Sequence, residues 1–359
     1  VACAVAAGRR ERQRPPTAPS SPEAMAATAA AACERAPPQE ADGDSELARG
    51  ALPPPPGGRW AIFSPLAVLA CTLLLLLELF VNASGADFDG PPTRECRFRV
   101  QLLGLKFCAA AIQVNPLFGP DAPALAHLGA MSGEEIADNW EVWRLLSGPF
   151  LPGGLVQWIG NVFALLSLGR SMEHLHGWWR VGAIYLLAGV AGGLACAMFT
   201  PYMLSAGLSG SICGLLGAAA GDVLLNWEVL SSPCCRLVKV LFSVALQALL
   251  GLAPLVDYFS LAVGFCVGLL SSVFVMDRLT LRTNCCASCS RQVSKGVAAI
   301  CVAAAFVGGV VLVFNVGGLD AQELCPGCEA LACAPFPWGC SSVECWWGCE
   351  AAEWPRIDR

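Results

Sequence analysis

A serine among small residues, at the head of a long apolar run, is the first candidate for chemistry in this sequence. Ser209 lies in the tetrapeptide Gly207-Leu208-Ser209-Gly210. A serine acts as a nucleophile when a base takes its proton and donors stabilise the oxyanion that forms on the substrate. The alternative interpretation is that Ser209 belongs to a helix-packing face of small residues, because glycines recur every three or four residues here. They stand at positions 207, 210, 214, 217 and 221.

Two amides and one carboxyl group are the other polar side chains that we single out within the apolar runs. Gln157 and Asn161 are four residues apart, so they share one face of a helix and both could point at Ser209. Asp257 stands at the start of a later run. Polar side chains inside a membrane are costly and often functional. The alternative is that the two amides only join neighbouring helices through hydrogen bonds.

The base that a nucleophilic serine requires is missing from these runs. The chain has three histidines: His127 in a long mixed loop, and His174 and His176 in a loop that we place at the opposite membrane face from Ser209. Because a span crosses ~30 Å of hydrocarbon, His174 and His176 cannot reach the serine. The residues therefore predict a serine site without a base.

The composition predicts the elements that must position these side chains. The chain has 359 residues, of which 55% are hydrophobic and only 14% charged, whereas soluble domains carry about 25% charge. Apolar runs of ~20 residues predict a polytopic, all-α membrane protein. The predicted spans are 61–81, 150–168, 181–199, 207–227, 237–253, 257–276 and 297–316. The net charge is −6 and the basic residues are scattered, so we expect no nucleic-acid partner.

The two ends of the chain differ from its centre. Residues 1–58 are rich in Ala, Pro, Glu and Arg, which predicts a disordered tail. The transmembrane domain covers 59–318, and we expect no cofactor and no metal in it. Residues 319–359 are acidic and rich in cysteine, so we favour disulfides there, with a zinc site on Cys325 and Cys328 as the alternative.

The charges of the loops predict the orientation of the spans. Loops after the second, fourth and sixth spans hold Lys and Arg, and the loops after the third and fifth spans hold none. The positive-inside rule then places 1–58 in the cytosol and 319–359 outside it. In this orientation Cys234 and Cys235 face the cytosol, where we expect them to be reduced.

The long loop after the first span contains an ambiguous stretch. Residues 98–111 are apolar but interrupted by Arg99 and Lys106, which favours a helix lying in the membrane interface. Trp140 and Trp143, further along the loop, are also typical of that interface.

Taken in order, these features resemble the rhomboid family of intramembrane serine proteases, from about Asn115 to Met276. The closest likeness is to eukaryotic secretase-type members, which have a seventh span after a six-span core. The matching pieces are Asn115–Pro120, Leu128-Gly129-Ala130, Trp143-Arg144-Leu145, Asn161, Gly169-Arg170 with Glu173 and Gly177, Tyr185, Gly192-Gly193, Gly207-Leu208-Ser209-Gly210, Asn226-Trp227 and Val256-Asp257.

The resemblance implies roles for the residues at the site. The family uses a Ser–His dyad, which assigns the nucleophile position to Ser209, but the position of the histidine in the sixth span is Leu261 here. On the oxyanion side Asn161 is kept and Gln157 replaces a histidine. Another common histidine, just before the second span, is Pro152 here. The resemblance assigns structural roles to Trp143, Arg144, Gly207, Gly210, Gly264 and Gly268, the glycines allowing close approach of the fourth and sixth spans.

The sequence therefore favours a pseudoprotease that keeps the rhomboid fold and binds transmembrane segments of client proteins. The alternative is an active serine endopeptidase that cleaves transmembrane substrates with an atypical base. A transporter or channel is disfavoured, because we take Asp257, which stands at a span end, as the one candidate for a charged relay. We expect a multi-pass protein of the secretory pathway or the plasma membrane, with transmembrane clients and the lipid bilayer as its partners.

Overall fold

The computed structural model describes residues 60–84, 96–102, 104–110, 115–201, 204–230, 232–250, 256–276 and 285–316. The tails predicted at 1–58 and 319–359 lie outside these residues. The predictions of disorder for the first tail and of disulfides or zinc for the second therefore remain predictions.

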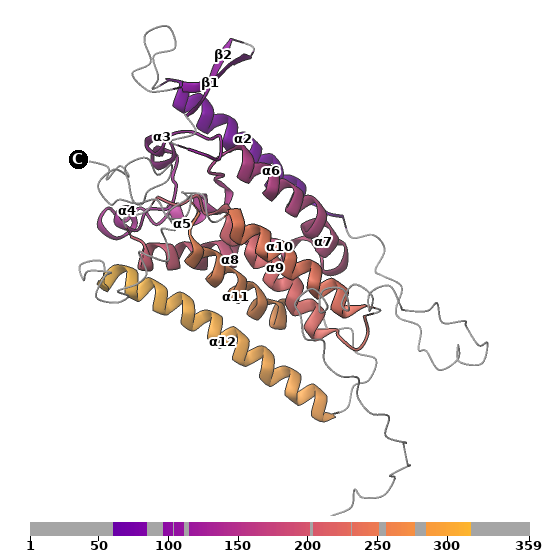
Figure 1. Cartoon of the computed structure of the whole chain (residues 1–359). Helices are drawn as coiled ribbons and strands as arrows, with labels where there is room; N and C mark the ends of the chain where they lie inside the picture. Colours follow the sequence, from indigo (N-terminus) through magenta and orange to yellow (C-terminus); the bar gives the residue numbers. More distant parts are fainter. Residues whose placement is uncertain are drawn as a thin grey trace, which may run out of the picture. The chain divides into compact units, whose positions relative to one another are not determined.

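Helices occupy every place at which the sequence predicts a span (Figure 1). Among the described residues, five helices are long and apolar enough to cross a bilayer, which confirms the polytopic helical fold. These are α2 (Phe63–Ser84), α8 (Trp178–Phe199), α9 (Leu208–Leu225), α11 (Tyr258–Val275) and α12 (Cys285–Val316).

The predicted second span is bent and interrupted. Its main part runs from Leu155 to His176 and consists of α6 (Leu155–Ala164), the π-helical turn η2 (Leu165–Gly169) and α7 (Arg170–His176). It meets the segment of α5 (Arg144–Ser147) and η1 (Gly148–Phe150) at an angle of 82°. Counted as one broken span, this pair gives a sixth crossing.

Helix α10 (Pro233–Leu250) lies where the sequence predicts the fifth span, but it is less apolar than the others. Arg236 and Lys239 fall in its first two turns, and it is not among the helices that meet the length and apolarity of a span. Its main neighbour is α9. It is therefore a peripheral element of the core.

The stretch predicted as an interfacial helix at 98–111 is a β-hairpin instead. Strands β1 (Cys96–Leu102) and β2 (Leu105–Ala110) pair antiparallel, and a disulfide joins Cys96 to Cys108. The chain reverses at Gly104, whose φ of +82° suits a residue without a Cβ. The prediction was wrong because strand pairing and a cross-link, rather than an apolar helix face, satisfy this segment.

Helix α9 is the most deeply buried of the five spanning helices. Its main contacts are with α11 and α8, and it also meets α10. Large apolar side chains of α8 and α9 form the centre of the core. They include Ile184, Tyr185, Leu208, Ile212 and Leu215.

Glycines bring α9 and α11 into backbone contact. A Cβ on Gly264 would overlap the carbonyl oxygen of Gly210, and one on Gly268 would overlap that of Gly214. This is the close approach that the sequence predicts for these four residues, which we call the glycine contact. No larger residue fits there unless the helices move apart.

A carboxylate from the second span caps the first span. Glu173 of α7 is fully buried and accepts hydrogen bonds from the backbone N–H groups of Ile62 (2.7 Å), Phe63 (2.9 Å) and Ser64 (2.7 Å), and from the Ser64 hydroxyl. These N–H groups are the unpaired donors at the start of α2, where the helix dipole also favours a negative charge. Glu173 therefore fixes the start of α2 against α7.

Candidate functional site

Ser209 lies in the first turn of α9 and is 2% exposed. Its hydroxyl oxygen has no hydrogen-bond partner among the described residues. Gly207, two residues earlier, approaches the backbone of Gly148, since a Cβ on Gly207 would be 3.1 Å from the Gly148 carbonyl carbon. The start of α9 is thus enclosed by protein, with the serine inside.

Position 261 is filled by an apolar side chain that belongs to the packing between α9 and α11. Leu261 is 7% exposed and shares an apolar cluster with Cys213, which lies one turn after Ser209 on α9. Leu117 and Val256 complete the cluster. Where the resemblance expects an imidazole, the structure holds hydrocarbon that can neither accept nor donate a proton.

No histidine takes that place from elsewhere. The Nε2 atom of His176 lies 3.2 Å from Asp222 Oδ1, and Asp222 is 13 residues, or ~20 Å, along α9 from Ser209. His127, at the end of α3 (Ala122–His127), and His174 are exposed. The described residues therefore supply Ser209 with no imidazole.

The two amides of α6 have their carbonyl oxygens bonded and their nitrogens unpaired. Gln157 Oε1 accepts from the Gly153 N–H at 2.5 Å, and Asn161 Oδ1 accepts from Gln247 Nε2 of α10 at 3.3 Å. Both residues are 1% exposed, and neither side-chain nitrogen has a partner within the described part of the chain. Two buried N–H donors are what an oxyanion site uses.

Gly153 links these amides to the segment before Ser209. A Cβ on Gly153 would lie 3.1 Å from Gln157 Oε1 and 3.2 Å from the Cβ of Ala206. Gln157 and Ala206 therefore both lie against Gly153. Ala206 is three residues before Ser209 in the chain. Whether the amides point at Ser209 itself stays a prediction.

Sequence reasoning missed Gln247. It is 6% exposed and supplies the hydrogen bond that connects α10 to α6. The signal was available, because Gln247 is a polar residue in the predicted fifth span, of the same kind as Gln157 and Asn161.

Asp257 has a structural explanation. It is 3% exposed and caps α11 by accepting hydrogen bonds from the backbone N–H groups of Phe259 (3.2 Å) and Ser260 (2.9 Å). An aspartate at this position stabilises the first turn of a helix.

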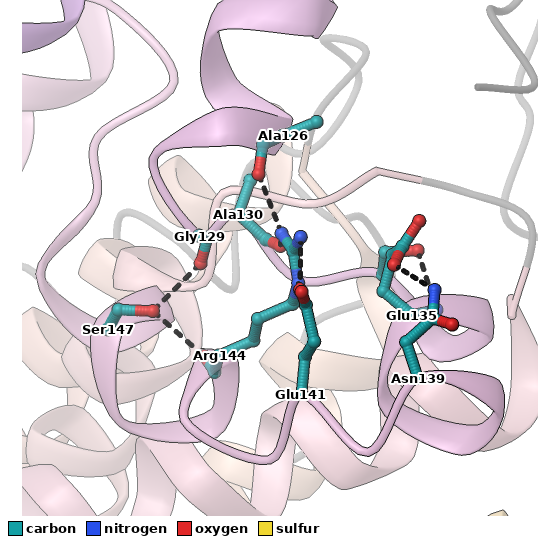
Figure 2. Close-up of polar contacts among 9 residues, drawn as sticks. Ala126, Gly129, Ala130, Glu135, Asn139, Glu141, Arg144 and Ser147 are labelled. Atoms are coloured by element: carbon teal, nitrogen blue, oxygen red, sulfur yellow. Dashed lines mark hydrogen bonds and ion pairs between the residues drawn. The ribbon is translucent and has the colours of Figure 1, made fainter. Parts of the chain in front are cut away.

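Arg144 clamps the loop that precedes the bent span (Figure 2). Its Nη1 donates to the carbonyl oxygens of Ala126 (2.8 Å) and Ala130 (2.9 Å), and its Nε donates to Glu141 Oε2 at 2.6 Å. The guanidinium carbon also lies 5.2 Å from the centre of the Trp143 ring. A buried cation is tolerated here because most of its donors are paired.

This clamp is connected to the serine segment. Ala130 precedes Met131, whose backbone N–H and carbonyl both pair with Ser205 at 2.9 Å. Trp143 packs against Gly129, since a Cβ there would overlap the indole ring. Arg144 and Trp143 thereby hold the loop that supports the chain four residues before Ser209.

Comparisons with known proteins agree with this geometry. A family model for the rhomboid domain matches residues 139–278. RHOMBOID-like protein 2 of Arabidopsis thaliana is 31% identical over 292 residues, which cover 78% of this chain and 90% of that protein. RHOMBOID-like protein 6, mitochondrial, of the same plant is 29% identical over 78% of this chain and 94% of its own length.

Two relatives have the word inactive in their names. Inactive RHOMBOID-like protein 8 of Arabidopsis thaliana is 28% identical over 76% of this chain and 82% of its own length. The glycine contact and the position of Ser209 at the head of α9 match what the sequence predicts for the fold. The chain is an integral, multi-pass membrane protein and belongs to the rhomboid family.

Proposed function

We propose that this protein is a rhomboid pseudoprotease that binds the transmembrane segments of client proteins without cleaving them. The observation that carries the proposal is Leu261, an apolar residue buried against α9 at the position of the dyad histidine. A general base must lie within hydrogen-bond reach of the proton that it takes. Loss of one member of such a catalytic unit lowers the rate by several orders of magnitude.

Client binding is supported by the peripheral position of α10. Large apolar side chains are exposed along this helix, including Val238, Leu241, Phe242, Leu246 and Leu249. Among the described contacts, one amide hydrogen bond, from Gln247 to Asn161, connects α10 to α6. An apolar helix of a client can pack on this face of α10 if its contacts there are better than those that lipid chains make.

An active protease with an atypical base is the second candidate. Two observations favour it: Ser209 is retained, and the side-chain nitrogens of Gln157 and Asn161, which have no partner among the described residues, could donate to an oxyanion. In this case a water molecule or a group on the substrate would have to take the proton of the serine.

Activity of the purified, unmodified protein distinguishes the two candidates. The pseudoprotease proposal predicts that a serine-directed phosphonate does not label Ser209 and that a helix-destabilised rhomboid substrate is not cleaved. Both signals should equal the background measured with Ser209→Ala. Pull-down of the same substrate should be equal for both proteins. Cleavage that disappears in Ser209→Ala would establish the protease instead.

We further propose that the N-terminus faces the cytosol, on the charges of the loops. Disulfides persist in oxidising compartments, but they do not decide the orientation: one joins Cys96 to Cys108 after the first span. Cys235, at the opposite end of the spans, is disulfide-bonded as well, so the expectation that it is reduced was wrong. Cys234 beside it is a free, exposed thiol.

Cys234 gives a direct test of the orientation. In sealed, right-side-out membranes an impermeant maleimide should label Cys234 only after permeabilisation. Ser84→Cys, an exposed position at the other end of α2, should be labelled without it. The reverse order would place the N-terminus outside the cytosol.

A further inference from the structure

Glu78 of α2 is a carboxyl group inside a membrane span, and the site around Ser209 does not use it. Its exposed fraction is 0%, and neither Oε1 nor Oε2 has a hydrogen-bond partner among the described residues. Ionisable side chains within membrane spans are rare, and most of them are paired. The position of Glu78 therefore needs an explanation.

Glu78 lies on the face of α2 that is turned toward the protein. Buried residues recur along this helix every three or four positions: Ser64, Ala67, Cys71, Leu75, Glu78 and Asn82. Leu74, one turn before Glu78, packs with Leu125, Ala130 and Leu151. The carboxyl group is thus next to an apolar cluster and away from lipid.

The titratable groups on the surrounding elements do not pair with it. Helix α2 contacts β2, α3, α6, η1, η2 and α8. No side chain of α6, η1 or η2 is titratable. The titratable side chains of the other elements and of α2 itself are Cys71, Lys106, His127, Arg180, Tyr185 and Cys196, with Asp121 at the cap of α3 and Glu173 of α7 at the start of α2. None of them is within hydrogen-bond distance of the Glu78 oxygens.

An unpaired carboxylate in an apolar interior is strongly unfavourable, and such a group takes up a proton instead. The neutral carboxyl group carries no net charge into the span and leaves a single O–H donor unpaired. We propose that Glu78 is a proton-binding site in the first span, and that loss of its proton loosens the end of α2 that holds the β-hairpin.

The link to the hairpin runs through Asn82, one turn further along α2. Asn82 Nδ2 donates to the carbonyl oxygen of Cys108 in β2 at 2.9 Å, and its Oδ1 accepts from the Asp121 N–H, at the start of α3, at 3.3 Å. A charge at Glu78 favours hydration of the turn that positions this asparagine. Both the hairpin and the start of α3 depend on that turn.

The sign of the pH effect follows from proton binding. A carboxylate at this buried position has no partner among the described residues, so charging it would draw water in between α2 and its neighbours. The end of α2 that holds the hairpin should therefore loosen, and stability should fall, as rising pH removes the proton. Acidification stabilises the hairpin end of α2.

Carbodiimide labelling of the full-length protein in lipid nanodiscs tests the protonation. Dicyclohexylcarbodiimide is apolar and reacts with protonated carboxyl groups: the proton moves to one nitrogen, the carboxyl oxygen bonds to the central carbon, and the acyl group then migrates to nitrogen with no leaving group. At pH 7 we expect this adduct at Glu78 by peptide mass spectrometry, and its loss in Glu78→Gln. An unlabelled Glu78, in a sample whose reagent is shown to be active, overturns the proposal.

Melting against pH tests the coupling to the hairpin. Glu78→Gln, an isostere of the neutral form, should flatten the fall in Tm between pH 5 and pH 8 and slow hydrogen exchange of Leu105–Ala110 at the upper end. The matched control is Glu134→Gln, an exposed carboxyl group of α4 (Gly133–Asp138), which should keep the wild-type profile. Equal pH profiles for wild type and Glu78→Gln would overturn the coupling. If Glu78→Gln does not fold, the labelling of wild type decides alone.

Discussion

The glycine contact and the polar residues of the site adjoin on α9, yet they differ in how far they keep the rhomboid arrangement. Gly210, Gly214, Gly264 and Gly268 bring α9 and α11 into backbone contact. Next to Gly210, the hydroxyl group of Ser209 has no hydrogen-bond partner in the described part of the chain, and position 261 is apolar. Helix packing and proton transfer therefore impose separate demands: the fold needs the glycines whether or not the chemistry is present.

Restoring the missing base at position 261 has the largest expected effect. Leu261→His would place an imidazole in the apolar cluster of α9 and α11. A positioned general base contributes about 10²–10⁴-fold in rate, so cleavage of a rhomboid substrate should rise from background by up to that factor. Gln157 and Pro152 also differ from the family, so the gain should lie at the lower end.

The control for this experiment is the double variant Leu261→His with Ser209→Ala. It keeps the imidazole but removes the nucleophile, so it should show no cleavage. If Leu261→His folds, as judged by its melting temperature, and cleaves no better than wild type, the missing histidine is not what separates this chain from an active member.

The second prediction concerns the glycine contact. Gly264→Leu forces a side chain against the backbone of Gly210, and overpacking of this kind costs roughly 1–3 kcal/mol or more. We expect lower expression and a lower melting temperature in detergent. Gly308→Leu in α12 is the matched control, because no atom lies within 4 Å of a Cβ at that position. Equal losses in both variants would show that leucine itself, and not the contact, is responsible.

The smallest change in stability is expected when the polar contact between α10 and α6 is removed. Gln247→Leu removes the hydrogen bond from α10 to Asn161, and such bonds between membrane helices contribute about 0.6 kcal/mol on average. The melting temperature should change little, while client pull-down should increase because α10 separates more easily from α6. Ser243→Ala, which removes only a hydrogen bond within α10 to the Lys239 carbonyl oxygen, is the control. A loss of stability as large as that of Gly264→Leu would contradict the separation of packing from polar contacts.

Much of the fold could be predicted because each span is a long apolar run that must satisfy its own backbone. The hairpin at 96–110 was missed although polar and apolar residues alternate from Arg97 to Leu102, which is the pattern of a strand. Its disulfide could not be predicted, since no local periodicity pairs the two cysteines. The role of Glu173 also escaped prediction: its partners in α2 lie about a hundred residues away in sequence. At the site, residue types identified Ser209, Leu261 and the amides, but the bond from Gln247 depends on how two separate helices meet.

The carboxylate that caps α2 has a consequence for biosynthesis. Glu173 follows Phe63 by 110 residues, so at ordinary synthesis rates the first span waits roughly 5–20 s for its cap. During that interval the N–H groups of Ile62, Phe63 and Ser64 need water or lipid head groups as partners. The nascent first span therefore has to keep this end at the membrane surface until the second span has emerged and inserted beside it.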